Sequence, residues 1–329
     1  MRLHRRGLRN LAGPRIAACL LTALALAACG QQKQETGAAP APPASAATAT
    51  PGTAGNASQA STSTGRIVIK PQFDEAGLFA EGLAAVRAGA KFGYIDKNGK
   101  IVIPPQFDFA GPFSGGLAPA GIGSKVGFID RQGQFAVLPK LEIADVFTFS
   151  EDLAAVRVGE YLSGKWGFID KQGKVVIEPK YDAAGSFSEG LAVVSAGGKW
   201  GYIDKAGKPV IAPQYASAGS FSDGLASVRI GDLFTGRDGY IDKQGKLVIP
   251  AQFEAAFPFH DGLADVQMDG KFGFIDKQGK LAVPAQFDFA DSFSNGLAAV
   301  RVGDETSGKY GYIDTQGKMA VTPQYDFAD

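Results

Sequence analysis

Short apolar runs separated by polar turns recur along the chain from Ile67 to its last residue. A run such as Ile101-Val102-Ile103 leads into a Pro-Gln-Phe-Asp type of segment, and after a turn comes a second run, such as Leu191–Val194. A third run, such as Trp200–Asp204, ends in another turn, after which the pattern begins again. Runs this short, bounded by turn residues, predict strands rather than helices. The pattern therefore predicts an all-β fold with three main strands per unit.

A glycine in the third run shows the period of the repeat. Successive copies of this glycine are 34, 40, 34, 38, 34 and 38 residues apart. Self-similarity at this period is typical of solenoids, propellers and other tandem arrays. The seven units that it defines are marked by Gly93, Gly127, Gly167, Gly201, Gly239, Gly273 and Gly311.

Each third run ends in an Asp-x-x-Gly turn, as in Asp96-Lys97-Asn98-Gly99. Asp at the first turn position and Gly at the last predict a type I turn followed by a left-handed glycine, which is a hairpin connection. We expect the carboxylate to accept backbone N–H groups of its own turn. A ladder of calcium sites is not expected, because one carboxylate per turn falls far short of the six to eight oxygens that calcium takes. No metal site is predicted.

The large aromatic residues recur at fixed places in the units. Two interpretations are open: a platform for stacking sugars, or a core in which each unit buries its apolar face on its neighbours, and the short unit favours the core. The three ladders are Phe79, Phe113, Phe149, Phe187, Phe221, Phe259 and Phe293; Tyr94, Phe128, Phe168, Tyr202, Tyr240, Phe274 and Tyr312; and Phe73, Phe107, Tyr181, Tyr215, Phe253, Phe287 and Tyr325, with Leu141 in one place of the third.

The segment Gly164–Lys174, GKWGFIDKQGK, resembles the signature of the bacterial WG-repeat family, and its variants cover the chain from Ile67 to Asp329. Tryptophan stands only at Trp166 and Trp200, so indole is not required at this position. Asp238 departs most from the pattern, and we expect a looser fifth unit. The resemblance implies a β-rich domain that mediates interactions.

The number of strand copies bears on closure. The Val-Ile-x-Pro-Gln-Phe-Asp strand occurs eight times, from Val68–Asp74 to Val321–Asp326, whereas a closed ring of seven units needs seven. We therefore expect seven tandem repeats in an elongated β-solenoid-like array whose last strand caps the stack. A closed seven-bladed β-propeller is the alternative.

Units three, five and seven differ from the others by a longer loop between the second and third strands. If neighbouring units point in alternate directions, one side of the array carries a row of arginines and long loops, which is a candidate interaction face. The other interpretation is that each arginine pairs with the carboxylate of its own loop. The candidate residues are Arg87, Arg157, Arg229 and Arg301, with Glu160, Asp232 and Asp304; units two, four and six carry Ala120, Ser195 and Gln267 in place of the arginine.

The N-terminal part is read as a leader and a tether. Basic residues precede an apolar run from Ile16 to Ala28, which is typical of a secretory signal, and Leu-Ala-Ala-Cys resembles the lipobox of bacterial lipoproteins. We expect a signal peptide over 1–28, lipid on Cys29, a disordered Ala/Pro/Ser/Thr-rich tether over 29–65 and the repeat domain over 66–329. Gly30 rather than Asp follows Cys29, which points to the outer membrane if the host is Gram-negative.

Composition excludes several classes of function. Without the five arginines of the leader, 28 basic residues face 33 acidic ones, which argues against a nucleic-acid surface. Beyond the leader the chain has one histidine, His260, and one cysteine, Cys29, so it lacks the residues of common zinc sites and thiol nucleophiles. We expect no cofactor and no enzyme, but a lipid-anchored envelope protein that binds an unknown protein. A carbohydrate or peptidoglycan binder and a passive spacer are the alternatives.

Overall fold

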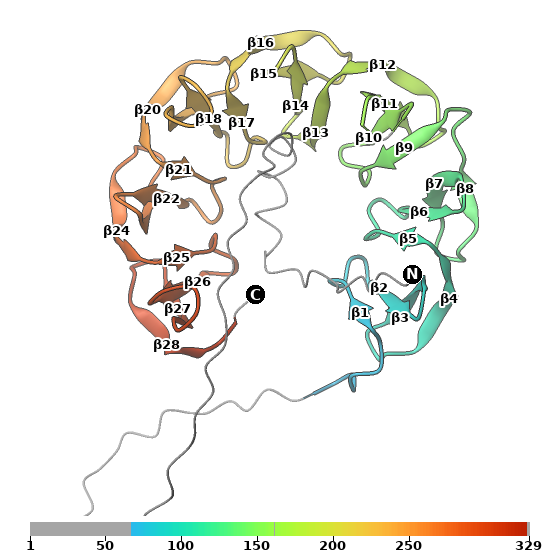
Figure 1. The fold of residues 1–329 in the computed structure, drawn as a ribbon, viewed down its shortest axis with the longest axis horizontal. Coiled ribbons are helices and arrows are strands. Elements are labelled where there is room, and N and C mark those ends of the chain that lie inside the picture. The colour runs from blue at the N-terminus through green and yellow to red at the C-terminus, as the bar shows by residue number, and fades with distance from the viewer. Residues whose placement is uncertain (1–66, 161, 328–329) are drawn as a thin grey trace, which may run out of the picture. The chain divides into compact units, whose positions relative to one another are not determined.

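The computed structural model describes residues 67–160 and 162–327, and their regular elements are all β-strands. These strands form seven antiparallel sheets of four strands each, with the strands of every sheet in sequence order (Figure 1). We number the sheets 1 to 7 along the chain. No helix in the described part is long and apolar enough to cross a membrane. The predicted signal peptide, Cys29 and the tether lie outside the described residues.

Each sheet has the same plan, and its strands are named by their place in it. The first strands are β1 (Glu75–Ala76), β5 (Phe109–Ala110), β9 (Ile143–Val146), β13 (Ala183–Ser188), β17 (Ser217–Ala218), β21 (Ala255–Ala256) and β25 (Phe289–Ala290). The second are β2 (Leu83–Ala88), β6 (Ala118–Ile122), β10 (Leu153–Val158), β14 (Leu191–Ala196), β18 (Ala226–Ile230), β22 (Ala264–Met268) and β26 (Leu297–Val302). The third are β3 (Lys91–Asp96), β7 (Lys125–Ile129), β11 (Lys165–Asp170), β15 (Lys199–Asp204), β19 (Arg237–Ile241), β23 (Lys271–Ile275) and β27 (Lys309–Asp314). The fourth are β4 (Ile101–Phe107), β8 (Phe135–Val137), β12 (Val175–Tyr181), β16 (Pro209–Tyr215), β20 (Leu247–Phe253), β24 (Leu281–Phe287) and β28 (Met319–Tyr325).

The glycine of the third strand allows the fourth strand to approach closely. In sheet 3, a Cβ atom on Gly167 would lie 2.5 Å from the carbonyl oxygen of Ile177 and 2.7 Å from the nitrogen of Pro179. The register between β11 and β12 is irregular at this place, with Trp166 opposite Tyr181 and Phe168 opposite Ile177. A side chain would push the two strands apart, which explains why every unit has glycine here.

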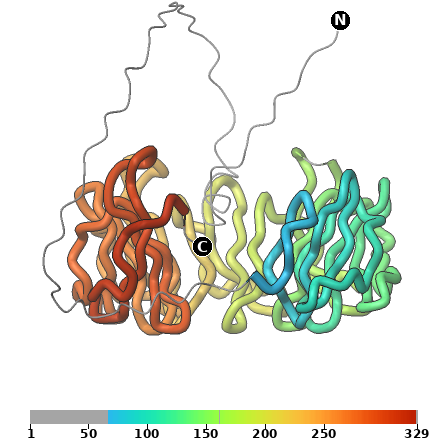
Figure 2. The backbone as a smooth tube through the Cα atoms, turned by 90° about the horizontal axis from the view of Figure 1, so that it is seen from below, coloured from blue at the N-terminus to red at the C-terminus, as the bar shows by residue number. Residues whose placement is uncertain are grey.

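Residues 67–327 follow an open arc in which the fourth strand of each sheet lies on the outer edge and the first strand on the inner side (Figure 1). Seen from the side, the strands run between two faces at which the turns and loops gather (Figure 2). Among the described residues no strand of sheet 7 pairs with one of sheet 1. The predicted open all-β array is therefore confirmed, and it is curved. All units point the same way, so the alternating directions considered from the sequence are wrong.

The core lies between neighbouring sheets. Leu83, Tyr94, Ile103 and Phe107 of sheet 1 pack on a cluster from sheet 2 that includes Phe113. Tyr94 meets Phe113 edge-on with ring centroids 4.9 Å apart, and its hydroxyl donates to the carbonyl oxygen of Gly111 at 2.7 Å. Burial raises the pKa of Tyr94 well above its usual range. The same packing recurs from sheet to sheet, so the members of the aromatic ladders that lie between neighbouring sheets are core.

The aspartate turns have the structure that the sequence predicts. In the turn after β11, the carboxylate of Asp170 accepts from the backbone nitrogens of Gln172 at 3.0 Å and Lys174 at 2.9 Å. The backbone nitrogen of Gly173 donates to the carbonyl oxygen of Asp170, and Gly173 has a φ of 77°. The carboxylates thus close the hairpins between the third and fourth strands.

The surplus copy of the repeated strand lies at the N-terminal end, not at the C-terminal one. The last copy is β28, which is the fourth strand of sheet 7. The first copy, 67–73, belongs to no strand, because no preceding third strand exists in the described residues to pair with it. Ile69 and Phe73 instead pack on Ala84, Val86 and Ile95 of sheet 1. The expectation that the last strand caps the stack is therefore corrected.

Candidate interaction face

The loops between second and third strands lie on the same side of all sheets, because the sheets share one strand order and one direction. We call this side the loop face and define it by the long loops 159–164, 231–236 and 303–308 together with Arg87, Arg157, Arg229 and Arg301. The arginines come from β2, β10, β18 and β26, close to the ends from which the loops leave. The structure thus brings the predicted arginines and loops to one side, at equivalent places in sheets 1, 3, 5 and 7.

Three of the four arginines pair with carboxylates of their own sheets rather than with those of their loops. Arg87 contacts Glu75 at 2.7 Å, and Arg157 contacts Asp145 at 3.0 Å. The Arg157 guanidinium also lies over the Trp166 ring, 5.4 Å from its centroid. Pairing of each arginine with the acidic residue that opens its own loop is therefore not what the structure shows.

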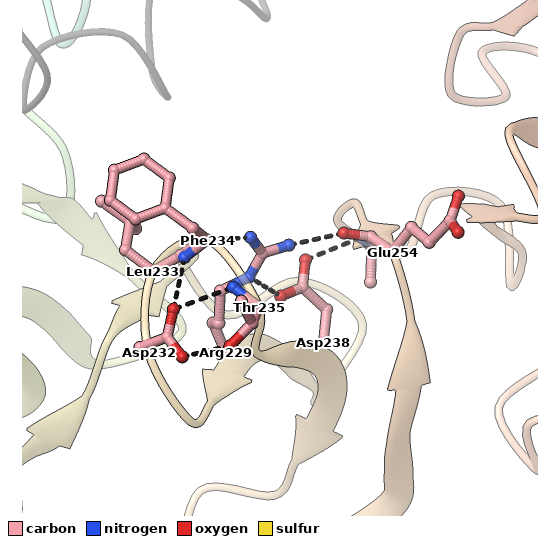
Figure 3. A network of polar contacts seen from close by, with 8 residues as sticks. Arg229, Asp232, Leu233, Phe234, Thr235, Asp238 and Glu254 are labelled. Atoms are coloured by element: carbon pink, nitrogen blue, oxygen red, sulfur yellow. Dashed lines mark hydrogen bonds and ion pairs between the residues drawn. The ribbon is translucent and has the colours of Figure 1, made fainter.

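Arg229 lies at the centre of a network of polar contacts in sheet 5 (Figure 3). Its Nε contacts Asp238 at 2.6 Å, and two other nitrogens donate to the carbonyl oxygens of Leu233 at 2.8 Å and Glu254 at 2.5 Å. The second carboxylate oxygen of Asp238 accepts from the backbone nitrogen of Ala256 at 3.0 Å. The fifth unit is thus tightly held at Asp238, and the expectation that it is looser there is wrong. Asp238 stands where five of the other six units have an aromatic ring, and it is the ion-pair partner of Arg229.

Two of the loop carboxylates brace their own loops. Asp232 accepts from the backbone nitrogens of Phe234 at 2.9 Å and Thr235 at 2.8 Å, and from the Thr235 hydroxyl. The hydrogen bond from the Thr235 side chain is the main reason why the pKa of Asp232 falls to about 2. Asp304 is bound in the same way by Ser307 and Thr306, and these bonds lower its pKa as well. The side chain of Glu160 is exposed.

The tips of two loops carry exposed apolar side chains that the sequence reasoning missed. Leu162 is 94% exposed and Phe234 is 86% exposed. Leu162 and Phe234 hold the same place in their loops, two residues after the acidic residue that opens the loop. An apolar residue at that place was the available signal. The equivalent tip in sheet 7, Glu305-Thr306, is polar.

A shallow, open hollow adjoins the loop of sheet 5. It is lined by Arg229, Phe234, Thr235, Gly236, Arg237 and Glu254. Arg237 contacts the carboxylate of Glu254 at 3.3 Å, so the charges on its wall are largely balanced. The hollow offers an apolar ring beside hydrogen-bonding groups, which suits contact with a peptide chain more than capture of a strongly charged ligand.

Arg301 is held by rings rather than by a carboxylate. Its guanidinium lies 5.9 Å from the Phe289 ring centroid and 5.8 Å from that of Tyr310. Its Nε is buried without a hydrogen-bond partner, and no ion pair of Arg301 occurs in the described part of the chain. Arg87, Arg157 and Arg229 each form an ion pair with a carboxylate, so Arg301 differs from them in this respect.

The register corrects one position in the even-numbered sheets. Gly121, not Ala120, is the equivalent of Arg87, because Gly121 lies opposite Val126 as Arg87 lies opposite Phe92. The Phe109 ring occupies the space that a side chain on Gly121 would need, since an added Cβ would lie 2.3 Å from it. His260 lies in the turn before β22, where its backbone nitrogen donates to the carbonyl oxygen of Leu263.

Solved structures that are similar to this chain at low sequence identity include the following three. The first is Hsv2 from Kluyvelomyces marxianus, with 11% identity and a TM-score of 0.43; the match covers 75% of this chain and 96% of that one. The second is Hsv2p from Kluyveromyces lactis, with 12% identity and a TM-score of 0.41; the match covers 73% of this chain and 74% of that one. The third is PorZ of Porphyromonas gingivalis, described as an essential bacterial surface component of the type-IX secretion system. It has 11% identity and a TM-score of 0.38, and the match covers 77% of this chain and 38% of that one. These likenesses support no statement about function. No curated protein matches the chain.

The repeat itself is matched by a known family. The description of that family is "WG containing repeat", and its matches cover residues 62–92, 92–125, 127–161, 166–200, 200–234, 239–272, 272–305 and 310–329. The matched residues contain the glycine that lets the fourth strand approach and the aspartate that closes the hairpin. The chain is therefore a member of the WG containing repeat family.

Proposed function

We propose that the loop face binds a protein in the bacterial cell envelope and that lipid on Cys29 anchors the chain there. The observation that carries this proposal is the exposure of Leu162 and Phe234 on loops of the same side. Single exposed apolar residues are common on protein surfaces, but these two sit at the tips of loops that exist only in alternate units.

Bracing of the sheet 5 loop adds to the argument. Asp232 fixes its backbone from one side, and Arg229 fixes it from the other through the carbonyl oxygen of Leu233. A loop that is ordered before binding loses less conformational entropy when a partner docks on it. The partner of this surface has an apolar pocket for Phe234 and polar groups around it. The role is non-enzymatic and needs no cofactor.

A photo-reactive amino acid at position 234 tests the proposal in intact cells. We expect it to cross-link to one envelope protein, and we expect binding of that protein to fall by about 100-fold in the double variant Phe234→Ala/Leu162→Ala, in line with two anchors of roughly 1.4 kcal/mol each. Leu138→Ala is the matched control, since Leu138 is 50% exposed and follows an outer strand. Equal binding by the double variant and the control contradicts the proposal.

The chain supplies a second variant with an intact scaffold. Replacing 231–236 by Gly-Gly copies the short loop of unit four, Gly197-Gly198, and leaves the flanking strands in place. If this variant no longer binds the partner that the cross-link identified, and its melting temperature is unchanged, the binding site lies on the loop. Retained binding to peptidoglycan by this variant, without any protein partner, supports the carbohydrate alternative instead, and binding to neither supports a spacer.

The anchor is tested separately. Cys29→Ser removes the thiol that would carry the lipid, and we expect the protein to move from the membrane fraction to the soluble fraction. Unchanged membrane residence rejects lipidation as the anchor and leaves the loop-face proposal standing.

A further inference from the structure

The C-terminal end of the array exposes a face that is buried in every other sheet. In sheet 1, Leu83 and Phe107 are buried under sheet 2, whereas their equivalents in sheet 7, Leu297 and Tyr325, are 41% and 48% exposed. Tyr312, the equivalent of Tyr94, is only partly buried. Sheet 7 therefore presents an apolar surface whose shape is set by the contacts between sheets.

The N-terminal end exposes the complementary face. Phe79 is 44% exposed, whereas its six equivalents are nearly completely buried. In the interior, each of these phenylalanines meets an aromatic ring of the preceding sheet, as Phe221 meets Tyr202 at 4.9 Å. A hollow lies beside Phe79, with Ile69, Phe73, Ala84 and Ile95 among its lining residues. This hollow is the place that the tyrosine and leucine of a preceding sheet would fill.

Polar groups at the two ends match in the same way. Between interior sheets, a serine hydroxyl donates to the carbonyl oxygen of the next ladder phenylalanine, as Ser150 does to Phe187 at 2.7 Å. An acidic side chain in the same turn accepts from the next glycine nitrogen, as Glu151 does from Gly190 at 3.1 Å. At the free end of sheet 7, Ser294 and Asn295 hold these two places. The carbonyl oxygen of Phe79 and the nitrogen of Gly82 hold the opposite places on sheet 1.

We propose that the C-terminal face of sheet 7 binds the N-terminal face of sheet 1 in a second copy of this chain, and so continues the stack from copy to copy. The junction would repeat an interface that already occurs six times between the seven sheets of one copy. Such a contact joins two different surfaces, so it propagates head to tail. The curvature of each copy then carries over into the assembly (Figure 1).

Segment 67–73 acts as a displaceable cap in this assembly. Ile69 and Phe73 occupy on sheet 1 the place that Ile103 and Phe107 occupy on sheet 2, so β28 of an incoming copy competes with them. β28 is hydrogen-bonded to β27 from Tyr310–Tyr325 to Ile313–Met319, whereas 67–73 is paired with no strand in the described residues. The cap is therefore the part that leaves.

Because the cap competes with an incoming copy, substitutions that disturb the cap should strengthen self-association. Ile69→Asp/Phe73→Asp disturbs the cap, and we expect it to strengthen self-association of the full chain by roughly tenfold or more. Sedimentation velocity over a concentration series in one detergent measures this. Adding Tyr312→Asp should return the protein to monomer. Association that persists with Tyr312→Asp shows unspecific sticking of sheet 1 and overturns the proposal, as does a capless variant that stays monomeric.

A variant that strengthens self-association tests the same junction, and a loss of folding could not produce that result. Lys205 and Lys243 contact glutamates of the preceding sheet at 3.1 Å and 3.0 Å, and Lys97 is their equivalent in sheet 1. Asn295→Asp supplies the missing carboxylate, and we expect tighter association that Lys97→Glu cancels.

A carbodiimide cross-link formed by Asn295→Asp in a mixture of ¹⁵N-labelled and unlabelled chains identifies the partner. Mixed-isotope peptides support the second copy. Peptides of one isotope only show closure of a chain on itself and overturn the proposal, and so does the absence of any cross-link to Lys97.

Discussion

Phe187 and Phe79 occupy the same place in different units, and replacing each by alanine measures what stacking contributes to stability. Phe187 is 1% exposed and packs edge-on against Phe168 with ring centroids 4.9 Å apart. Burying a phenylalanine is worth up to about 3 kcal/mol, and the cavity left in a core raises the cost of truncation to about 3–5 kcal/mol. We therefore expect Phe187→Ala to destabilise the domain by about 3–5 kcal/mol.

We expect Phe79→Ala to destabilise the domain much less than Phe187→Ala does. Being 44% exposed, it buries little more than half the fraction of its surface that Phe187 buries, and its open surroundings can relax without a closed cavity. The expected loss for Phe79→Ala is about 1–2 kcal/mol. The two variants have the same change in chemistry and differ in burial alone.

Urea unfolding followed by tryptophan fluorescence makes the comparison. Trp166 belongs to the core cluster that contains Phe187, and Trp200 packs on the next cluster, so fluorescence reports on the sheets that surround the interior site. Repeat proteins can unfold in parts, so circular dichroism is recorded in parallel to show whether the transition is cooperative. Equal losses for the two variants, or a loss below about 1 kcal/mol at Phe187, would refute the view that packing between sheets holds this fold.

Other predictions concern single contacts. Gly167→Ala places a Cβ 2.5 Å from a carbonyl oxygen and should cost about 1–3 kcal/mol, whereas Gly77→Ala meets its nearest atom at 3.6 Å and should cost less than about 0.5 kcal/mol; similar melting temperatures for both would contradict this. Ser150→Ala removes the bond to the Phe187 carbonyl between sheets 3 and 4 and should lower stability by about 1 kcal/mol in urea unfolding, with the exposed Ser163→Ala as the neutral control. The pKa of Asp232 is about 2 when folded, against 3.8 ordinarily, so its bracing of the loop is complete above about pH 4 and is lost as the pH falls through 2. NMR shifts of the Phe234 and Thr235 amides should follow this titration, and Asp232→Asn should abolish it; a midpoint near 4 would contradict the bracing.

The candidate face was only partly visible in the sequence. Loop length and the recurring arginines pointed to residues that do lie on one side of the array. The partners of these arginines were not visible, because Glu75 and Asp145 lie on the first strand and Asp238 on the third. Each of the three meets its arginine only through cross-strand register. Exposure of Phe234 depended on the turn of its loop, which spacing alone does not specify.

What the sequence by itself determined is local and repetitive. Three features depend only on contacts within one unit or between adjacent units: the turn at Asp170 and Gly173, the strand glycine at Gly167 and the spacing of the aromatic ladders. Each feature recurs in the seven similar units, so the sequence shows it seven times. The tertiary structure decided two features: the curvature, which adds up over all units, and the arrangement at the N-terminal end of the array. The curvature of the arc accumulates from small rotations between sheets that no single motif encodes. Which copy of the repeated strand is left over, 67–73 rather than β28, follows from a pairing rule: the strand hydrogen-bonds to the third strand before it in the chain, and the first copy has none in the described residues.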